Sequence, residues 1–154
     1  MTMHAVGSAI PHPLKVEHDT LFYRLDRAST LPGPIGQAVR ALLDALQPHQ
    51  VAEETYALPP LAVLQALSES EIPAEASAVI MMVERLRQEL PTMHQEHRAI
   101  AALLQNLVTA AREEQNDEIE ALSDMVTLHI EMEERILYPA ALLVGELLRL
   151  KLRR

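Results

Sequence analysis

The amino-acid sequence predicts an all-α protein in which four long helices form a bundle, with short extra helical segments between and after them. The chain has 154 residues, of which 49% are hydrophobic but only 3% are aromatic, and it has no Trp. A core built mainly from Leu, Ala, Ile, Val and Met favours helices. The chain contains only 4 glycines and no long run of alternating β-branched residues, so little is available to form a sheet.

Prolines and polar turns mark the expected helix boundaries. We expect long helices over residues 14–29, 34–57, 74–113 and 117–137, a short one over 61–69, and a C-terminal helical extension over 139–154. Pro48 and Pro91 fall inside two of the long helices and predict kinks there, because proline removes a backbone hydrogen bond. The length fits a single domain over residues 1–154, with the bundle at about 14–139.

The two halves of the chain resemble each other in their polar motifs. The pair Glu17-His18 recurs as Glu96-His97, and the pattern HxxxEE at residues 49–54 recurs at 129–134. The histidine of the HxxxEE pattern follows that of the Glu-His pair by 31 residues in the first half and by 32 in the second. This repeat predicts two helical hairpins related by an approximate twofold axis.

Each of the four long helices carries an apolar stripe with three- and four-residue spacing, and each stripe includes one histidine. Two of the stripes add a glutamate one turn after the histidine. The stripes are Leu14, His18, Leu21, Leu25 and Ala28; Val39, Leu42, Leu46, His49, Glu53 and Tyr56; Leu86, Leu90, Met93, His97, Ile100, Leu104 and Leu107; and Leu122, Val126, His129, Glu133 and Ile136. The pattern therefore predicts four buried histidines and two buried glutamates.

Two buried carboxylates need a compensating charge, because burying each one alone costs several kcal/mol. No Lys or Arg lies on the four stripes, so a metal ion is the simplest source of that charge. Residues four apart lie on one helix face about 6 Å apart along the axis. His49 can thus bind one ion while Glu53 shares its oxygens with a second, and His129 with Glu133 repeats the arrangement. Imidazole and carboxylate ligands suit iron, manganese or zinc.

Composition argues against several other kinds of function. The chain has no cysteine, which excludes disulfides, thiolate metal sites and cysteine catalysis and fits a reducing cytoplasm. The net charge of −9 argues against a nucleic-acid surface. No apolar run reaches membrane-spanning length, and the longest, at 140–150, is broken by Glu146 and Arg149. We therefore expect a cytoplasmic protein with neither nucleic acid nor membrane as partner.

Together these motifs resemble those of the hemerythrin-like domains, also called HHE cation-binding domains. The matching motifs are EH at 17–18, HxxxEE at 49–54, EH at 96–97 and HxxxEExxLYP at 129–139. The resemblance implies an up-down-up-down bundle with a non-haem di-iron centre that has room for a solvent-derived bridge. It assigns His18, His49, His97 and His129 as terminal ligands and Glu53 and Glu133 as bridges. The four-His, two-Glu set is similar to that of bacterial di-iron proteins tied to nitric oxide stress and iron–sulfur repair.

Several polar residues near these motifs are expected to have lesser roles. His94 precedes His97 by three residues, and we expect it at the surface or beside the site rather than as a fifth ligand. Glu54 and Glu134 are expected in solvent or in contact with ligands rather than with metal. His4 and His12, in the arm before the first helix, are expected to be exposed.

Three functions follow as hypotheses. The leading one is a di-iron protein that binds or reduces a small ligand, oxygen, nitric oxide or peroxide, as carrier, sensor or scavenger. The second is a di-iron oxidoreductase, so whether the protein is an enzyme stays open. The third is a metal-free helical module that binds a partner or forms a homodimer. The apolar residues of segment 140–150 could either cover the end of the bundle or pair with another chain; they are Leu142, Leu143, Leu147, Leu148 and Leu150.

Overall fold

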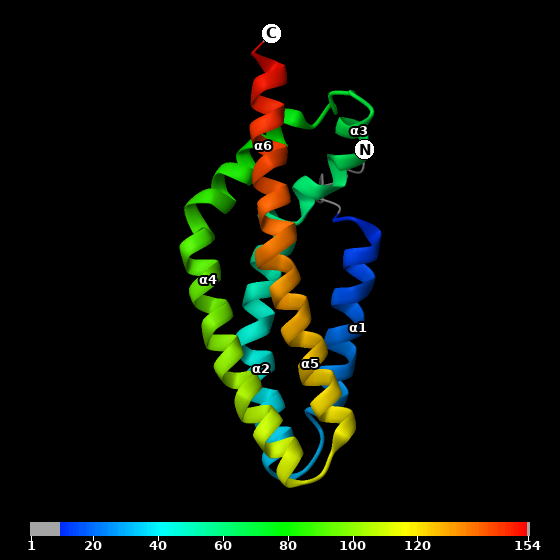
Figure 1. Cartoon of the computed structure of the whole chain (residues 1–154), viewed down its shortest axis with the longest axis vertical. Coiled ribbons are helices and arrows are strands. Elements are labelled where there is room, and N and C mark those ends of the chain that lie inside the picture. The colour runs from blue at the N-terminus through cyan, green and yellow to red at the C-terminus, as the bar shows by residue number, and fades with distance from the viewer. Residues whose placement is uncertain (1–9, 154) are drawn as a thin grey trace, which may run out of the picture.

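The computed structural model describes residues 10–153, and these are helical throughout apart from short turns, with no strand among them. The four long helices of the bundle are α1 (His12–Ala28), α2 (Gly33–Ala52), α4 (Ala76–Glu113) and α5 (Asp117–Met132). Figure 1 shows them alternating in direction, with the α1–α2 and α4–α5 turns at the same end of the molecule. The predicted all-α bundle is confirmed.

Short helical segments connect and extend the bundle. Between α2 and α4 the chain forms a π-helical turn η1 (Glu53–Ala57), a 3₁₀ turn η2 (Pro59–Val63) and the short helix α3 (Leu64–Ser68). A second π-helical turn, η3 (Glu133–Leu137), leads from α5 directly into α6 (Tyr138–Leu152). Figure 1 shows α6 continuing the direction of α5 beyond the end of α1. None of the described helices is long and apolar enough to cross a membrane.

The helix ends have identifiable chemical causes. Gly33 adopts a positive φ of 73° at the start of α2, a conformation that glycine adopts without strain. Asn116 caps α5, because its side chain accepts a hydrogen bond from the backbone N–H of Ile119 at 3.2 Å. Pro48 and Pro91 lie inside α2 and α4, which continue through them, and both side chains are exposed. The kinks expected at these prolines stay predictions.

Buried apolar side chains fill the bundle above and below a polar layer. Near the hairpin turns a leucine-rich cluster draws on all four long helices, and includes Leu25, Leu42, Leu107 and Leu122. On the other side of the layer Tyr56, Met93, Tyr138 and neighbouring residues form a second cluster. A third packs α6 against the first part of α4, where Gly145 faces Val83 so closely that a Cβ would clash. The polar layer is thus enclosed on both sides by packed apolar groups.

One residue of the predicted stripes lies on the wrong side of its helix. Ile136, expected in the core, is 60% exposed. The π-helical turn η3 takes more residues per turn than an α-helix, so the helix face that points inward shifts along the sequence. Tyr138, 1% exposed, and Ala141, 0% exposed, occupy the interior after the turn instead. The prediction for Ile136 assumed an unbroken α-helical period, which η3 interrupts.

Candidate metal centre

Six polar side chains from both hairpins meet in the middle of the bundle. They are the four site histidines, His18, His49, His97 and His129, and the two inner carboxylates, Glu53 and Glu133. Their exposed fractions lie between 1% and 8%, so all six are buried. The histidines come from α1, α2, α4 and α5, and the glutamates begin η1 and η3. The structure brings together every residue that the sequence analysis selected as a ligand.

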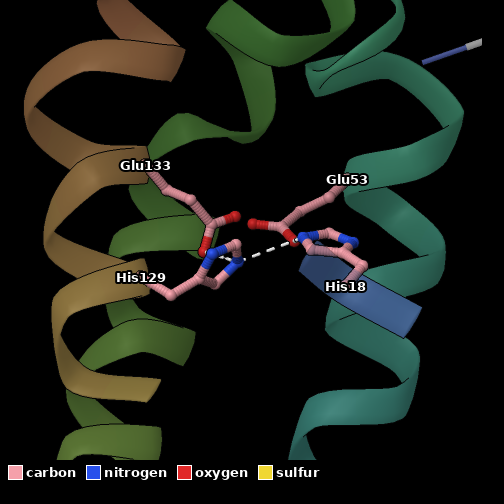
Figure 2. A group of neighbouring side chains, drawn as sticks. All are labelled: His18, Glu53, His129 and Glu133. Atoms are coloured by element: carbon pink, nitrogen blue, oxygen red, sulfur yellow. Dashed lines mark hydrogen bonds and ion pairs between the residues drawn. The ribbon is translucent and has the colours of Figure 1, made fainter. Parts of the chain in front are cut away.

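The six side chains divide into two groups that each offer four ligand atoms within 4.8 Å of one another. Position A consists of His18, His129, Glu53 and Glu133 (Figure 2). Position B consists of His49, His97, Glu53 and Glu133. Each position takes one histidine from each hairpin, and both inner carboxylates belong to both positions. The arrangement is that of two adjacent ligand groups that could each hold a metal ion and that share two carboxylates.

Distances within the layer follow the internal repeat. His49 Nε2 lies 3.1 Å from Glu53 Oε1, and His129 Nε2 lies 3.1 Å from Glu133 Oε1. The Nε2 atoms of the two histidines at position A are 3.1 Å apart, and those at position B are 2.8 Å apart. The equal His–Glu distances and the similar His–His distances agree with the approximate twofold relation predicted from the sequence.

A second set of glutamates contacts the outer nitrogen of each site histidine. These outer carboxylates are Glu17 on His129 at 2.5 Å, Glu54 on His18 at 3.3 Å, Glu96 on His49 at 2.5 Å, and Glu134 on His97 at 2.8 Å, all to Nδ1. A carboxylate accepts a hydrogen bond from Nδ1–H, which assigns the proton to Nδ1 and leaves the Nε2 lone pair free to point inward. Such carboxylate–histidine contacts orient ligands at many metal sites.

The inner atoms of the layer are nearly all hydrogen-bond acceptors. With Nδ1 protonated, each site histidine presents a lone pair, and the two inner carboxylates present only oxygens. No Lys or Arg side chain is among the groups that contact the inner carboxylates in residues 10–153. Two lone pairs facing each other at 2.8–3.1 Å repel unless a proton or cation lies between them. The nitrogen and oxygen donor set fits a divalent metal ion at each position.

Proton affinities in the layer reflect burial and mutual contact. Burial opposes ionisation of both His49 and Glu53, but the contact between the two side chains outweighs it. Glu96 adds to this effect at His49, and Tyr138 adds to it at Glu53. The pKa of His49 is therefore raised and that of Glu53 is lowered. Burial, and then the neighbouring histidines, lower the pKa of His97 and of His129. Neutral imidazole, the form that binds metal, is therefore favoured at residues 97 and 129.

Comparison with known families agrees with this geometry. A model of the hemerythrin HHE cation binding domain matches residues 9–141. The chain belongs to this family. Comparison with curated proteins and with solved structures gives no significant match. Membership in the hemerythrin HHE family and the buried His/Glu cluster are both compatible with metal binding.

Both inner carboxylates of this HHE domain begin a π-helical turn. The carbonyl of Glu53 accepts from the backbone N–H of Leu58 at 2.9 Å, five residues on, and that of Glu133 accepts from Tyr138 in the same way. Single π turns inside α-helices are rare and frequent at functional sites. The repeat therefore extends to the backbone, since the same wide turn follows the same HxxxE pattern in both hairpins.

Tyr138 is a site residue that the sequence analysis did not select. Its hydroxyl donates a hydrogen bond to Glu53 Oε1 and lies 3.3 Å from His97 Nε2. Its ring stacks on that of His97, with centroids 5.7 Å apart. Burial and the adjacent Glu53 charge raise the pKa of Tyr138, so the phenol stays protonated and acts as a donor. The 80-residue offset between the HxxxEE patterns places Leu58 at the equivalent point of the other hairpin.

Position A adjoins a small apolar cavity of about 20 Å³. Besides site residues, the cavity is lined by Leu21, Phe22, Leu25, Leu46, Gln50, Val126 and Ile130. About 10–15 Å³ is enough for one water-sized molecule, so the space admits a molecule of a few atoms. The two positions thus differ in surroundings, because the cavity is lined by both histidines of position A but only His49 of position B, whereas the Tyr138 hydroxyl lies near both histidines of position B.

Other candidate residues lie apart from the two ligand groups. His94 is half-buried on α4 and belongs to neither position. His12 is exposed, as expected, but forms the first residue of α1 rather than part of an arm. His4 lies outside the described residues.

Proposed function

We propose that this hemerythrin HHE domain holds two iron ions, one at position A and one at position B, and binds or reduces a small ligand. Manganese and zinc also fit the donor set, and iron follows from the family resemblance. The observation that carries the proposal is that Glu53 and Glu133 each belong to both ligand groups. Two carboxylates shared between two adjacent four-ligand positions are the arrangement that a paired metal centre needs.

The chain's own residues supply binding, orientation and enclosure. Two imidazoles and the two shared carboxylates give each ion four protein ligands, which leaves room for a solvent-derived bridge and an open position. The outer carboxylates orient the imidazoles, and Tyr138 holds Glu53 by a hydrogen bond. A bound iron pair supplies reversible binding of, and electron transfer to, oxygen, nitric oxide or peroxide. The cavity beside position A suits such a small ligand and excludes larger ones.

The proposed role is carrier, sensor or scavenger, with turnover as a second candidate. The specific observation in favour of a di-iron oxidoreductase is Tyr138, because a buried hydroxyl beside position B could donate a hydrogen bond to a ligand that is being reduced. Steady-state consumption of peroxide or nitric oxide with a supplied reductant separates the two roles. A cytoplasmic location stays part of the prediction.

Iron content measured on protein purified without a His-tag tests the proposal. Anaerobic reconstitution with ferrous iron should give close to two irons per chain, and admission of air or nitric oxide should change the absorption spectrum. Glu131→Gln, at an exposed position of α5, serves as a control that should bind the same amount. A content near zero, or one that stays at a single ion per chain, would overturn the paired centre.

A further inference from the structure

An apolar stripe runs along the outer face of α6. Leu143 is 68% exposed, Leu150 is 60% exposed and Leu147 is 40% exposed, and Ile136 just before the helix is 60% exposed. With the partly exposed Ala140 these residues follow the spacing four, three, four, three. The face that packs on α4 is a different one, formed by residues such as Val144 and Leu148, which are 2% and 0% exposed. Four of these five residues are exposed and point away from the bundle, whereas Ala140 is partly buried against the cluster that contains Tyr138.

This stripe continues the buried stripe of α5 in sequence but not in space. Leu122, Val126, His129 and Glu133 face the bundle interior, and Ile136 and Leu143 follow at the same heptad spacing. The π-helical turn η3 lies between the two parts and changes which face points inward. The sequence thus keeps its heptad pattern over a segment where the bundle no longer covers it. If water were the only neighbour of this face of α6, polar residues would be expected at the stripe positions.

We propose that the outer stripe of α6 pairs with the same stripe of a second copy of this chain, in parallel about a twofold axis. Heptad apolar positions on two like helices are the pattern that such helices bury together. A twofold axis along α6 brings each stripe residue against its own equivalent, so one surface supplies both sides of the contact. Figure 1 shows α6 in front of the rest of the chain over most of its length.

Charges beside the stripe favour the parallel arrangement. If Leu143 and Leu150 take heptad position d and Leu147 takes position a, Glu146 takes position g and Lys151 takes the following position e. In a parallel pair of helices the g residue of one chain faces the next e residue of the other. Glu146 of each chain then lies opposite Lys151 of the other chain, which gives two attractive charge pairs across the axis. Within residues 10–153 Lys151 forms no ion pair, whereas Glu146 contacts Arg87 at 2.9 Å.

The size of the stripe sets the expected strength of the dimer. Two stripes of this length would bury on the order of 1,000 Å² in total, at the lower end of the range for specific interfaces. We therefore expect a dimer that dissociates at micromolar concentrations rather than a permanent one. The inference does not depend on iron, because no stripe residue belongs to the metal centre.

Single-cysteine variants give a direct test, because the chain has no cysteine of its own. Leu150→Cys should form a disulfide-linked dimer under mild oxidation, since a parallel twofold axis places residue 150 opposite itself. Leu64→Cys, at a 45% exposed leucine of α3 outside the stripe, should stay largely uncrosslinked. Crosslinking only in a mixture of Ile136→Cys and Leu150→Cys would overturn the parallel arrangement.

Sedimentation over a range of concentrations tests the dimer without cysteines. Wild type should change from monomer to dimer between about 1 and 100 µM, and the double variant Leu143→Glu, Leu150→Glu should raise the dissociation constant at least tenfold. Leu64→Glu should leave the dissociation constant unchanged. Helix content and iron content, measured on all three proteins, confirm that the fold is intact. Wild type that stays monomeric throughout would overturn the proposal and leave the metal centre unaffected.

Discussion

Replacing Glu53 with Gln removes one negative charge from a carboxylate that positions A and B share. Iron present at about a hundred times its dissociation constant stabilises the folded state by about 2.7 kcal/mol per ion, hence about 5.4 kcal/mol for two. For a domain of this length that raises the melting temperature by roughly 10–20 °C. Because Glu53 is a member of both ligand groups, Glu53→Gln should lose most of this increase and most of the iron at both positions.

The assay compares melting temperatures with and without ferrous iron under anaerobic conditions, with metal analysis of the same samples. Glu131→Gln, which removes an exposed carboxylate, should keep the full increase. His18→Ala gives the decisive contrast, because His18 belongs to position A alone. It should retain close to one iron per chain and about half of the stabilisation. Two irons retained by Glu53→Gln, or equal loss in both variants, would refute the shared-carboxylate arrangement.

Three further predictions concern the surroundings of the ions. Glu96→Gln, which weakens the 2.5 Å contact to His49 Nδ1, should lower iron affinity about 10–100-fold in equilibrium titrations while the apo fold is kept. Tyr138→Phe removes a hydrogen bond to Glu53 and should lower the free energy of unfolding of the apo protein by about 1.5–3 kcal/mol in denaturant titrations. Tyr56→Phe should cost less, because among residues 10–153 the Tyr56 hydroxyl contacts the weak acceptor Met93 Sδ at 3.5 Å. Val126→Ile adds a methyl group toward the 20 Å³ cavity and should weaken nitric oxide binding to iron-loaded protein several-fold, with iron content unchanged; an unchanged affinity would argue against ligand entry there.

The site histidines and inner carboxylates could be selected from sequence because helical period alone decides which face they occupy. His49 and Glu53 fall on one stripe with Leu42 and Leu46, and packing of that stripe buries them together. Four stripes, each with a histidine, then define one layer without any knowledge of side-chain contacts. The sequence left open which histidines share an ion, since that pairing depends on how the two hairpins meet.

The positions of the outer carboxylates and of Tyr138 in the site depend on features that the helical period of the sequence does not reveal. Glu17 adjoins His18 in sequence but points to a different side of α1, where it reaches His129 of α5. That contact follows from the register between helices, although the repeated Glu-His pair was a signal that both residues matter. Tyr138 faces the interior only because η3 is a π-helical turn, and a sequence with an ordinary helical period gives no sign of that turn.

The internal repeat explains why there are two groups of side chains that could each hold an ion, and the departures from it explain how the two groups differ. The twofold relation exchanges His18 with His97 and His49 with His129, so it converts position A into position B. A perfectly repeated chain would therefore make two identical positions. Tyr138 stands where the other hairpin has Leu58, so only position B has a hydroxyl donor, while the cavity adjoins position A. The asymmetry therefore lies in the surroundings of the two ligand groups, because the apolar cavity reaches both histidines of position A and the Tyr138 hydroxyl reaches both histidines of position B.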